Sequence, residues 1–265
     1  MIKINNFFDN SNVKCIAEGG VFSIYEHQHD LSVDSNTAMN SYFMEQMNVK
    51  KRQVLCKLDN STVKLQAGAM QWMLGNVNAT TGIKGAGDLI SKAFRGKASG
   101  ESIVKPEYTG DGLLMLEPTY KHLILIDLKD WNQSIVLDDG LFLACSSELK
   151  QKTVARSNLS SAVAGGEGLF NLGLEGDGIV CLEADCPKEE LIEINLENDV
   201  LKVDGNFAIA WSGSLSFTVE RSGKTLIGSA ASGEGLVNVY RGTGKVLLAP
   251  VGNGNIMRNG FPGMQ

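Results

Sequence analysis

The chain has 265 residues, and its 24 Lys and Arg against 30 Asp and Glu give a formal net charge of −6 at pH 7. An apolar fraction of 43% and a charged fraction of 20% are typical of a folded globular protein and argue against a disordered chain. The acidic balance argues against nucleic-acid binding, because proteins that bind phosphates usually carry basic patches. The densest basic run, Lys50–Arg52, is short, and we interpret it as a solvated strand end. The 30 glycines and 5 prolines favour short strands joined by many turns.

His27 and His29 form the first candidate site along the chain. On a strand, residues two apart share a face, so both imidazoles could bind one metal ion. A cupin-like metal site would need a Glu four or five residues after the second histidine, but Val33 and Asp34 occupy those positions. We therefore interpret the pair as an exposed polar strand end. A metal site formed by His27, His29 and Asp34 remains the weaker alternative.

Helix is expected at only two places. The segment Asp88–Phe94 contains good helix formers and follows Gly85 and Gly87, and Asp88 is suited to cap a helix. We predict that it forms a short helix inserted into the first repeat unit. The segment Ala38–Met47 is a weaker helical candidate.

The rest of the chain repeats itself at an interval near 66 residues. Gly112, Gly178 and Gly244 each open a short apolar run, and each glycine lies 66 residues from the next. A second strand-like segment recurs at residues 63–72, 135–144 and 201–210. Repeats of this length are typical of architectures in which each copy is one structural unit.

These markers predict how the chain is divided. We expect a single compact domain over residues 1–250, followed by a glycine-rich tail at 251–265. Within the domain we expect N-terminal strands in 1–52 and repeat units at 53–118, 119–184 and 185–250. Apolar residues alternate with polar or small ones from 201 to 209, as in a strand with one face on a core. The predicted fold class is all-β, with about three short double-stranded β-helix or jelly-roll-like units.

No candidate for catalysis or a cofactor satisfies its chemistry. Cys181 and Cys186 lack the second ligand pair that a zinc site needs. The segment Ser222–Thr225 is similar to the end of a phosphate loop, but the required glycine is replaced by Thr218. Three histidines leave few bases for a catalytic triad. We therefore predict no enzymatic activity, no catalytic residues and no cofactor.

The cysteines and the apolar runs bear on the compartment. Five cysteines without regular spacing do not indicate a disulfide framework. No secretory leader and no apolar run of the ~18 residues that a membrane helix needs is visible in the sequence. We expect a reduced cytoplasmic protein without an integral membrane segment.

Three strings in the later units resemble a known family: Gly-Glu-Gly-Leu-Phe at 166–170, Gly-Asp-Gly-Ile-Val at 176–180 and Leu-Asp-Asp-Gly-Leu-Phe-Leu-Ala at 137–144. They look like the altered-inheritance-of-mitochondria, or mitochondrial biogenesis, family, and the resemblance covers about residues 53–250. It implies a fold related to the tryptophan RNA-binding attenuation protein, whose units assemble into rings. It implies no reaction, and the link of mitochondrial relatives to inner-membrane organisation suggests a scaffold. RNA binding is not carried over, because the copied positions are Glu and Gly.

The sequence therefore predicts a non-enzymatic structural or protein-interaction module of unknown process. Its expected partners are copies of itself, with a trimer favoured, and an unidentified protein, but not nucleic acid. One alternative is a small-molecule or carbohydrate-binding module that uses a β-barrel mouth. Another is a cupin-like, metal-dependent enzyme that uses His27 and His29.

Overall fold

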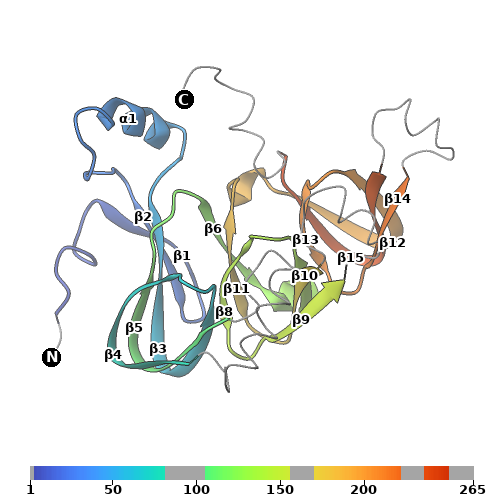
Figure 1. Ribbon diagram of the computed structural model, residues 1–265, viewed down its shortest axis with the longest axis horizontal. Coiled ribbons are helices and arrows are strands. Elements are labelled where there is room, and N and C mark those ends of the chain that lie inside the picture. The colour runs from blue at the N-terminus through green and yellow to red at the C-terminus, as the bar shows by residue number, and fades with distance from the viewer. Residues whose placement is uncertain (1–2, 81–104, 156–169, 222–235, 251–265) are drawn as a thin grey trace, which may run out of the picture.

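The computed structural model describes residues 3–80, 105–155, 170–221 and 236–250. Within these ranges the chain forms two β-sheets, one α-helix and two short 3₁₀ turns, so the prediction of an all-β fold is confirmed. Figure 1 shows strands β1–β5 at one end of the molecule and β12–β15 at the other. Both sheets curl, and helix α1 projects from the end that carries the first strands.

The first sheet has eight strands: β1 (Val13–Gly19), β2 (Phe22–His27), β3 (Arg52–Leu65), β4 (Met70–Thr80), β5 (Glu107–Leu116), β6 (His122–Asp127), β8 (Phe142–Ser146) and β11 (Ile179–Ala184). Their order is β1-β2-β3-β8-β11-β6, with β5 also paired to β3 and β4 paired to β5. Every pairing is antiparallel. The long strand β3 thus joins two parts of the sheet, because β5 pairs along most of its length while β2 and β8 pair with its opposite ends.

The second sheet has seven strands: β7 (Ser134–Leu137), β9 (Lys150–Ala155), β10 (Phe170–Glu175), β12 (Ile192–Asp204), β13 (Ala208–Ser212), β14 (Ser216–Arg221) and β15 (Leu236–Leu248). Their order is β12-β15-β13-β7-β10-β9, and β14 pairs with β15. From β6 to β12 each strand lies in the other sheet from the strand before it, except that β10 pairs with β9 in the second sheet. The 3₁₀ turns η1 (Leu128–Trp131) and η2 (Lys188–Glu190) lie on two of the connections between the sheets.

The largest core cluster is formed by strands of both sheets. Ile126 and Leu182 from the first sheet pack in one cluster with Leu137, Leu174 and Ile209 from the second. Burying a large aliphatic side chain contributes roughly 1.5 to 3 kcal/mol, so this shared core holds the two sheets together. Separate clusters line the first sheet and the β12–β15 end of the second.

A glycine corner recurs along the chain at the interval seen in the sequence. Positive φ angles occur at both glycines of each Gly-x-Gly: 141° and 156° at Gly110 and Gly112, 120° and 157° at Gly176 and Gly178, and 120° and 159° at Gly242 and Gly244. L-residues with a side chain rarely adopt such angles. A Cβ on the second glycine would also lie 2.0 Å from Leu74 O, 2.9 Å from Ser146 Cβ or 2.8 Å from Ser212 Cβ, in chain order. Only glycine fits these corners.

A β-bulge recurs as well. It lies at Gln71 between β4 and β5, at Leu143 between β8 and β11, and at Ile209 between β13 and β15. Two residues before each bulge, a backbone carbonyl accepts a hydrogen bond from the partner side, with N···O distances of 2.8, 2.9 and 2.8 Å. The later two bulges are 66 residues apart, so much of the backbone between β4 and β15 follows one pattern.

Helix α1 spans Ala38–Gln46, which confirms the weaker of the two helical predictions. The other predicted helix, Asp88–Phe94, lies outside the described residues. So do the segment Ser222–Thr225 and the tail at 251–265.

Candidate functional site

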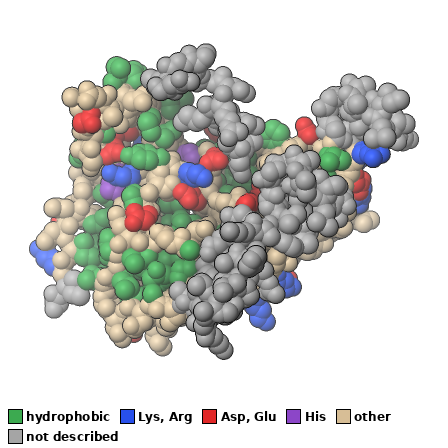
Figure 2. Space-filling model, in the orientation of Figure 1, with side chains coloured by type: hydrophobic (Ala, Val, Ile, Leu, Met, Phe, Trp, Pro, Cys, Tyr) green, Lys and Arg blue, Asp and Glu red, His purple; other side chains and the backbone are tan. Residues whose placement is uncertain are grey.

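The connection between β2 and β3, residues 28–51, is a helical hairpin whose helix points its apolar side chains outward. Met39, Tyr42, Phe43 and Met47 are between 59% and 77% exposed, and their spacing places them on one face. No residue of α1 is buried. A surface helix normally turns its apolar stripe toward the core, so the outer stripe of α1 is reversed. Figure 2 shows apolar side chains at the surface in the region of α1.

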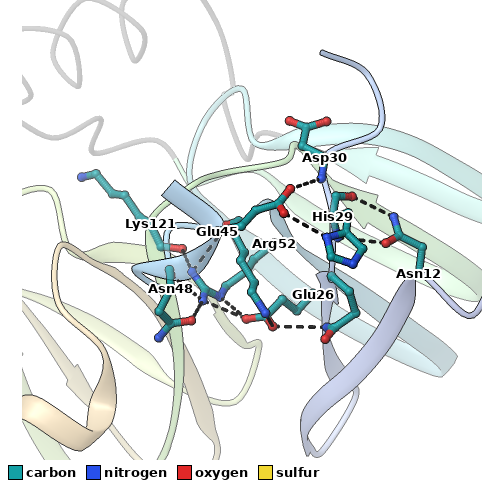
Figure 3. A network of polar contacts seen from close by, with 10 residues as sticks. Asn12, Glu26, His29, Asp30, Glu45, Asn48, Arg52 and Lys121 are labelled. Atoms are coloured by element: carbon teal, nitrogen blue, oxygen red, sulfur yellow. Dashed lines mark hydrogen bonds and ion pairs between the residues drawn. The ribbon is translucent and has the colours of Figure 1, made fainter. Parts of the chain in front are cut away.

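The inner face of α1 is anchored through Glu45. One carboxylate oxygen lies 2.9 Å from His29 Nδ1, and the other accepts a 2.6 Å hydrogen bond from the Asp30 backbone N–H. Figure 3 shows this carboxylate pointing toward His29 and Asp30. These contacts, led by the hydrogen bond from His29, lower the pKa of Glu45 below its usual value. Glu45 therefore connects α1 to the residues that directly follow β2.

Asp30 is the second anchor of the hairpin. Its carboxylate accepts hydrogen bonds from the Tyr120 hydroxyl and from Lys51 Nζ, the latter at 3.0 Å. The hydrogen bond to Asp30 raises the pKa of Tyr120 to about 12. The same bond, followed by that from Lys51, holds the pKa of Asp30 below its usual value. The carboxylate thus stays ionised at neutral pH and ties the hairpin to the segment after β5.

Arg52 lies at the centre of the polar network in Figure 3. Its side chain is only 3% exposed, and its Nη2 lies 2.8 Å from Glu26 Oε2. The same nitrogen donates to the Asn48 side-chain oxygen at 2.8 Å, and Nη1 donates to the Lys121 carbonyl at 3.4 Å. The prediction that Lys50–Arg52 is a solvated strand end is therefore wrong for Arg52, because its side chain is buried and contacts one carboxylate and four carbonyl oxygens.

The three residues considered for a metal site have separate partners. His27 Nε2 lies 3.1 Å from Gln53 Oε1, whereas His29 contacts Glu45. Asp34 accepts from the backbone N–H of Asn36 at 2.7 Å, just before α1 begins. Strand β2 ends at His27, so the two histidines do not share a strand face. In the described parts of the chain, no group of three or more His, Cys, Asp or Glu is arranged to hold a metal ion.

A second site, which the sequence did not indicate, lies on the outer face of β3–β5. It is a hollow of about 330 Å³. Its apolar lining is Phe7, Trp72, Met115 and Pro118, and its polar lining is His27, Lys51, Gln53 and Gln71. Trp72 and Trp211 both lie at the end of strand-like segments that recur in the sequence, which predicts that both pack in the core. The structure differs for Trp72, whose ring is only partly buried at this hollow, whereas Trp211 is buried.

The cysteines show no reactive arrangement. All five are free. Cys15 is exposed, and the other four are buried. Burial raises the pKa of Cys145 to about 12 and holds that of Cys181 well above its usual value. A thiol that resists ionisation is a poor nucleophile, so the buried cysteines serve as packing residues.

Comparisons with known proteins identify a matching family and a similar solved structure. Over residues 44–251 the chain matches the family described as mitochondrial biogenesis AIM24. No functionally curated protein matches it. Among solved structures it is similar to the crystal structure of protein SPYM3_0169 from Streptococcus pyogenes, with 26% sequence identity and a TM-score of 0.57. That match covers 78% of this chain and 90% of the streptococcal one.

The family match begins inside α1, so β1, β2 and most of the helical hairpin precede it. Within the residues that the structure describes, no helix is both long and apolar enough to cross a membrane.

Proposed function

The chain belongs to the mitochondrial biogenesis AIM24 family, as its sequence predicts, and we propose that it is a non-enzymatic interaction module that binds copies of itself through the outer stripe of α1. The observation that carries this proposal is the reversed helix. Met39, Tyr42, Phe43 and Met47 remain mostly exposed in the single chain, and no residue of α1 is buried. Contiguous exposed apolar surface of this kind marks interaction sites.

The charge distribution favours a second copy as the partner. Two copies with a net charge of −6 each repel one another unless their contact surfaces are neutral. Glu45 is the only charged residue of α1, and its carboxylate points inward to His29 and Asp30. The outer stripe is therefore uncharged and can face an identical stripe without repulsion.

The area of the stripe is compatible with an assembly of several copies. Together with Leu31, which is also exposed, the four side chains of the stripe present roughly 600 Å² of surface. A standard interface takes about 800 Å² from each partner. Three helices meeting on a threefold axis would bury both flanks of each stripe, which favours the trimer. The free cysteines support a reducing compartment, the cytoplasm, as its place of work.

Analytical ultracentrifugation of the full chain at tens of micromolar tests the proposal. We expect the wild type to sediment above the monomer mass, with the trimer as the main species. Phe43→Asp should sediment as a folded monomer, because it places a charge in the stripe without disturbing a core. Val200→Asp is the matched control: it adds the same charge at an exposed apolar residue of β12, at the other end of the molecule.

Two results would contradict the proposal. One is a wild type that is monomeric at these concentrations. The other is an assembly that survives Phe43→Asp as well as it survives Val200→Asp.

A further inference from the structure

The hollow on the outer face of β3–β5 departs from the repeated backbone at one residue. Leu143 and Ile209 occupy the later bulges, and both are buried in the core. At the first bulge the residue is Gln71, and its side chain is exposed at the hollow. A bulge changes the direction of a side chain and is common beside binding sites. The first bulge thus presents an amide at the surface, where the later two bulges bury an apolar side chain.

The amide belongs to a row of three polar side chains. His27 Nε2 lies 3.1 Å from Gln53 Oε1, and Gln53 Nε2 donates to Gln71 Oε1 at 2.9 Å. Gln53 is buried, and its amide nitrogen also donates to the Leu116 carbonyl at 3.3 Å. Gln53 thus holds Gln71 by its oxygen. The Gln71 amide nitrogen donates to no other described residue, so its N–H groups remain for a ligand in the hollow.

The rest of the lining is mostly apolar. It includes the Trp72 ring with Met115 and Pro118. Neither of the equivalent positions in the later strands carries an aromatic ring, because Ala144 and Ala210 follow those bulges. An indole face beside fixed amide donors suits a ring that is apolar on one face and carries oxygens at its edge.

The charge of the hollow selects against ions. Lys51 is the only formally charged residue of the lining, and Asp30 neutralises it at 3.0 Å. An anionic ligand would find no unpaired cation. We propose that this hollow binds a neutral saccharide, one sugar ring stacking on Trp72 while its hydroxyl oxygens accept hydrogen bonds from the Gln71 amide. A volume of about 330 Å³ is at the lower end for small-molecule sites, which suits one or two sugar rings.

Tryptophan quenching gives a direct readout of this site. Trp131 and Trp211 are buried, whereas Trp72 is partly exposed, so acrylamide should quench Trp72 selectively. We would titrate the full chain with glucose, galactose, N-acetylglucosamine, maltose and cellobiose to tens of millimolar. At least one sugar should protect Trp72 saturably, and calorimetry of that sugar should give the same midpoint.

The variants separate a binding site from a structural feature. Gln71→Leu installs the residue of the next bulge, so we expect an unchanged or higher unfolding temperature and about tenfold weaker sugar binding by calorimetry. Trp72→Ala should abolish binding. Met73→Ala is the matched control, because it removes the adjacent exposed side chain of β4, which does not line the hollow, and should bind like the wild type.

The proposal is overturned if no sugar protects Trp72, or if only uncharged compounds of another class, such as nucleosides, do so. It is also overturned if Gln71→Leu binds the sugar with unchanged affinity. Phe43→Asp should bind the sugar like the wild type, because α1 does not contribute to the hollow. Failure of self-association and failure of sugar binding are therefore distinguishable.

Discussion

Strands β1–β5 and strands β12–β15 share features of their backbones, but they differ in which side chains they pack and which they expose. Both ends have the Gly-x-Gly corner and the bulge. In the last strands Trp211, two residues after the bulge, packs against Phe217 and Tyr240 with ring centroids 5.3 Å apart in both cases. In the first strands Trp72 lies beside an open hollow, and a reversed helix projects nearby. The difference shows that similar backbone features carry different surfaces at the two ends.

The largest expected effect is a loss of stability when the second glycine of a Gly-x-Gly corner is replaced. It tests whether the corners at the two ends of the molecule are equivalent. Gly112→Ala and Gly244→Ala should each lower the free energy of unfolding by about 4 kcal/mol, since each adds backbone strain and a steric overlap. Chemical denaturation followed by circular dichroism measures this. Gly68→Ala is the control, because it also has a positive φ, of +83°, but no atom lies within 4 Å of the added Cβ. We expect it to cost about 1 kcal/mol.

A Gly244→Ala variant no less stable than Gly68→Ala would contradict the common architecture of the two ends. The outcome would then mean that the corner in the last strands can relax, unlike the corner in the first.

The corners and the buried strands could be predicted from the sequence because their signals are local. A glycine that must adopt a positive φ is conserved in each copy, so Gly112, Gly178 and Gly244 show the period directly. Cys181 lies within an apolar run of the sequence, which predicts a buried strand, and it is fully buried in β11. Local alternation and turn residues carry this kind of information.

The burial of Arg52 could not be predicted in the same way. Its neighbours Lys50 and Lys51 make the segment look solvated, and its partner Glu26 lies 26 residues earlier in the chain. The pairing exists only once β2 and β3 are side by side. The same holds for His29, which meets Glu45 only because the hairpin folds back. The sequence did contain a signal for Gln71. It is a polar residue at the position that the apolar residues Leu143 and Ile209 occupy in the later segments.

The second prediction compares an ion pair at each end. Arg52→Met should lower the free energy of unfolding by about 3 kcal/mol, because it leaves the Glu26 carboxylate in the interior without its closest cation. At the other end, Arg241 pairs with Glu220 at 2.7 Å, but both side chains are more than a third exposed. Arg241→Met should therefore be close to neutral. Urea denaturation of both variants measures the contrast, and equal losses would show that burial does not distinguish the two pairs.

The smallest expected effect is a local release of the hairpin in acid. The pKa values of Asp30 and Glu45 are lowered in the folded chain. Groups of this kind stabilise the folded state above their unfolded pKa and lose that contribution as pH falls through the folded pKa. As the pH falls below about 4, the contacts to Tyr120, Lys51 and His29 should therefore weaken as the carboxylates gain protons.

Hydrogen exchange measured by mass spectrometry and normalised to intrinsic rates would follow this release. Protection of residues 28–51 should fall before that of β12, because the hairpin has no buried apolar side chain to hold it once its anchors are protonated. In Glu45→Gln, the hairpin should exchange faster at pH 7 and depend less on pH. If residues 28–51 instead keep their protection until the sheets unfold, the hairpin is held by something other than its carboxylates. In a stable assembly, contacts between the outer stripes of neighbouring copies would also hold the hairpin. The release of the hairpin in acid should therefore be clearest in the monomeric Phe43→Asp variant.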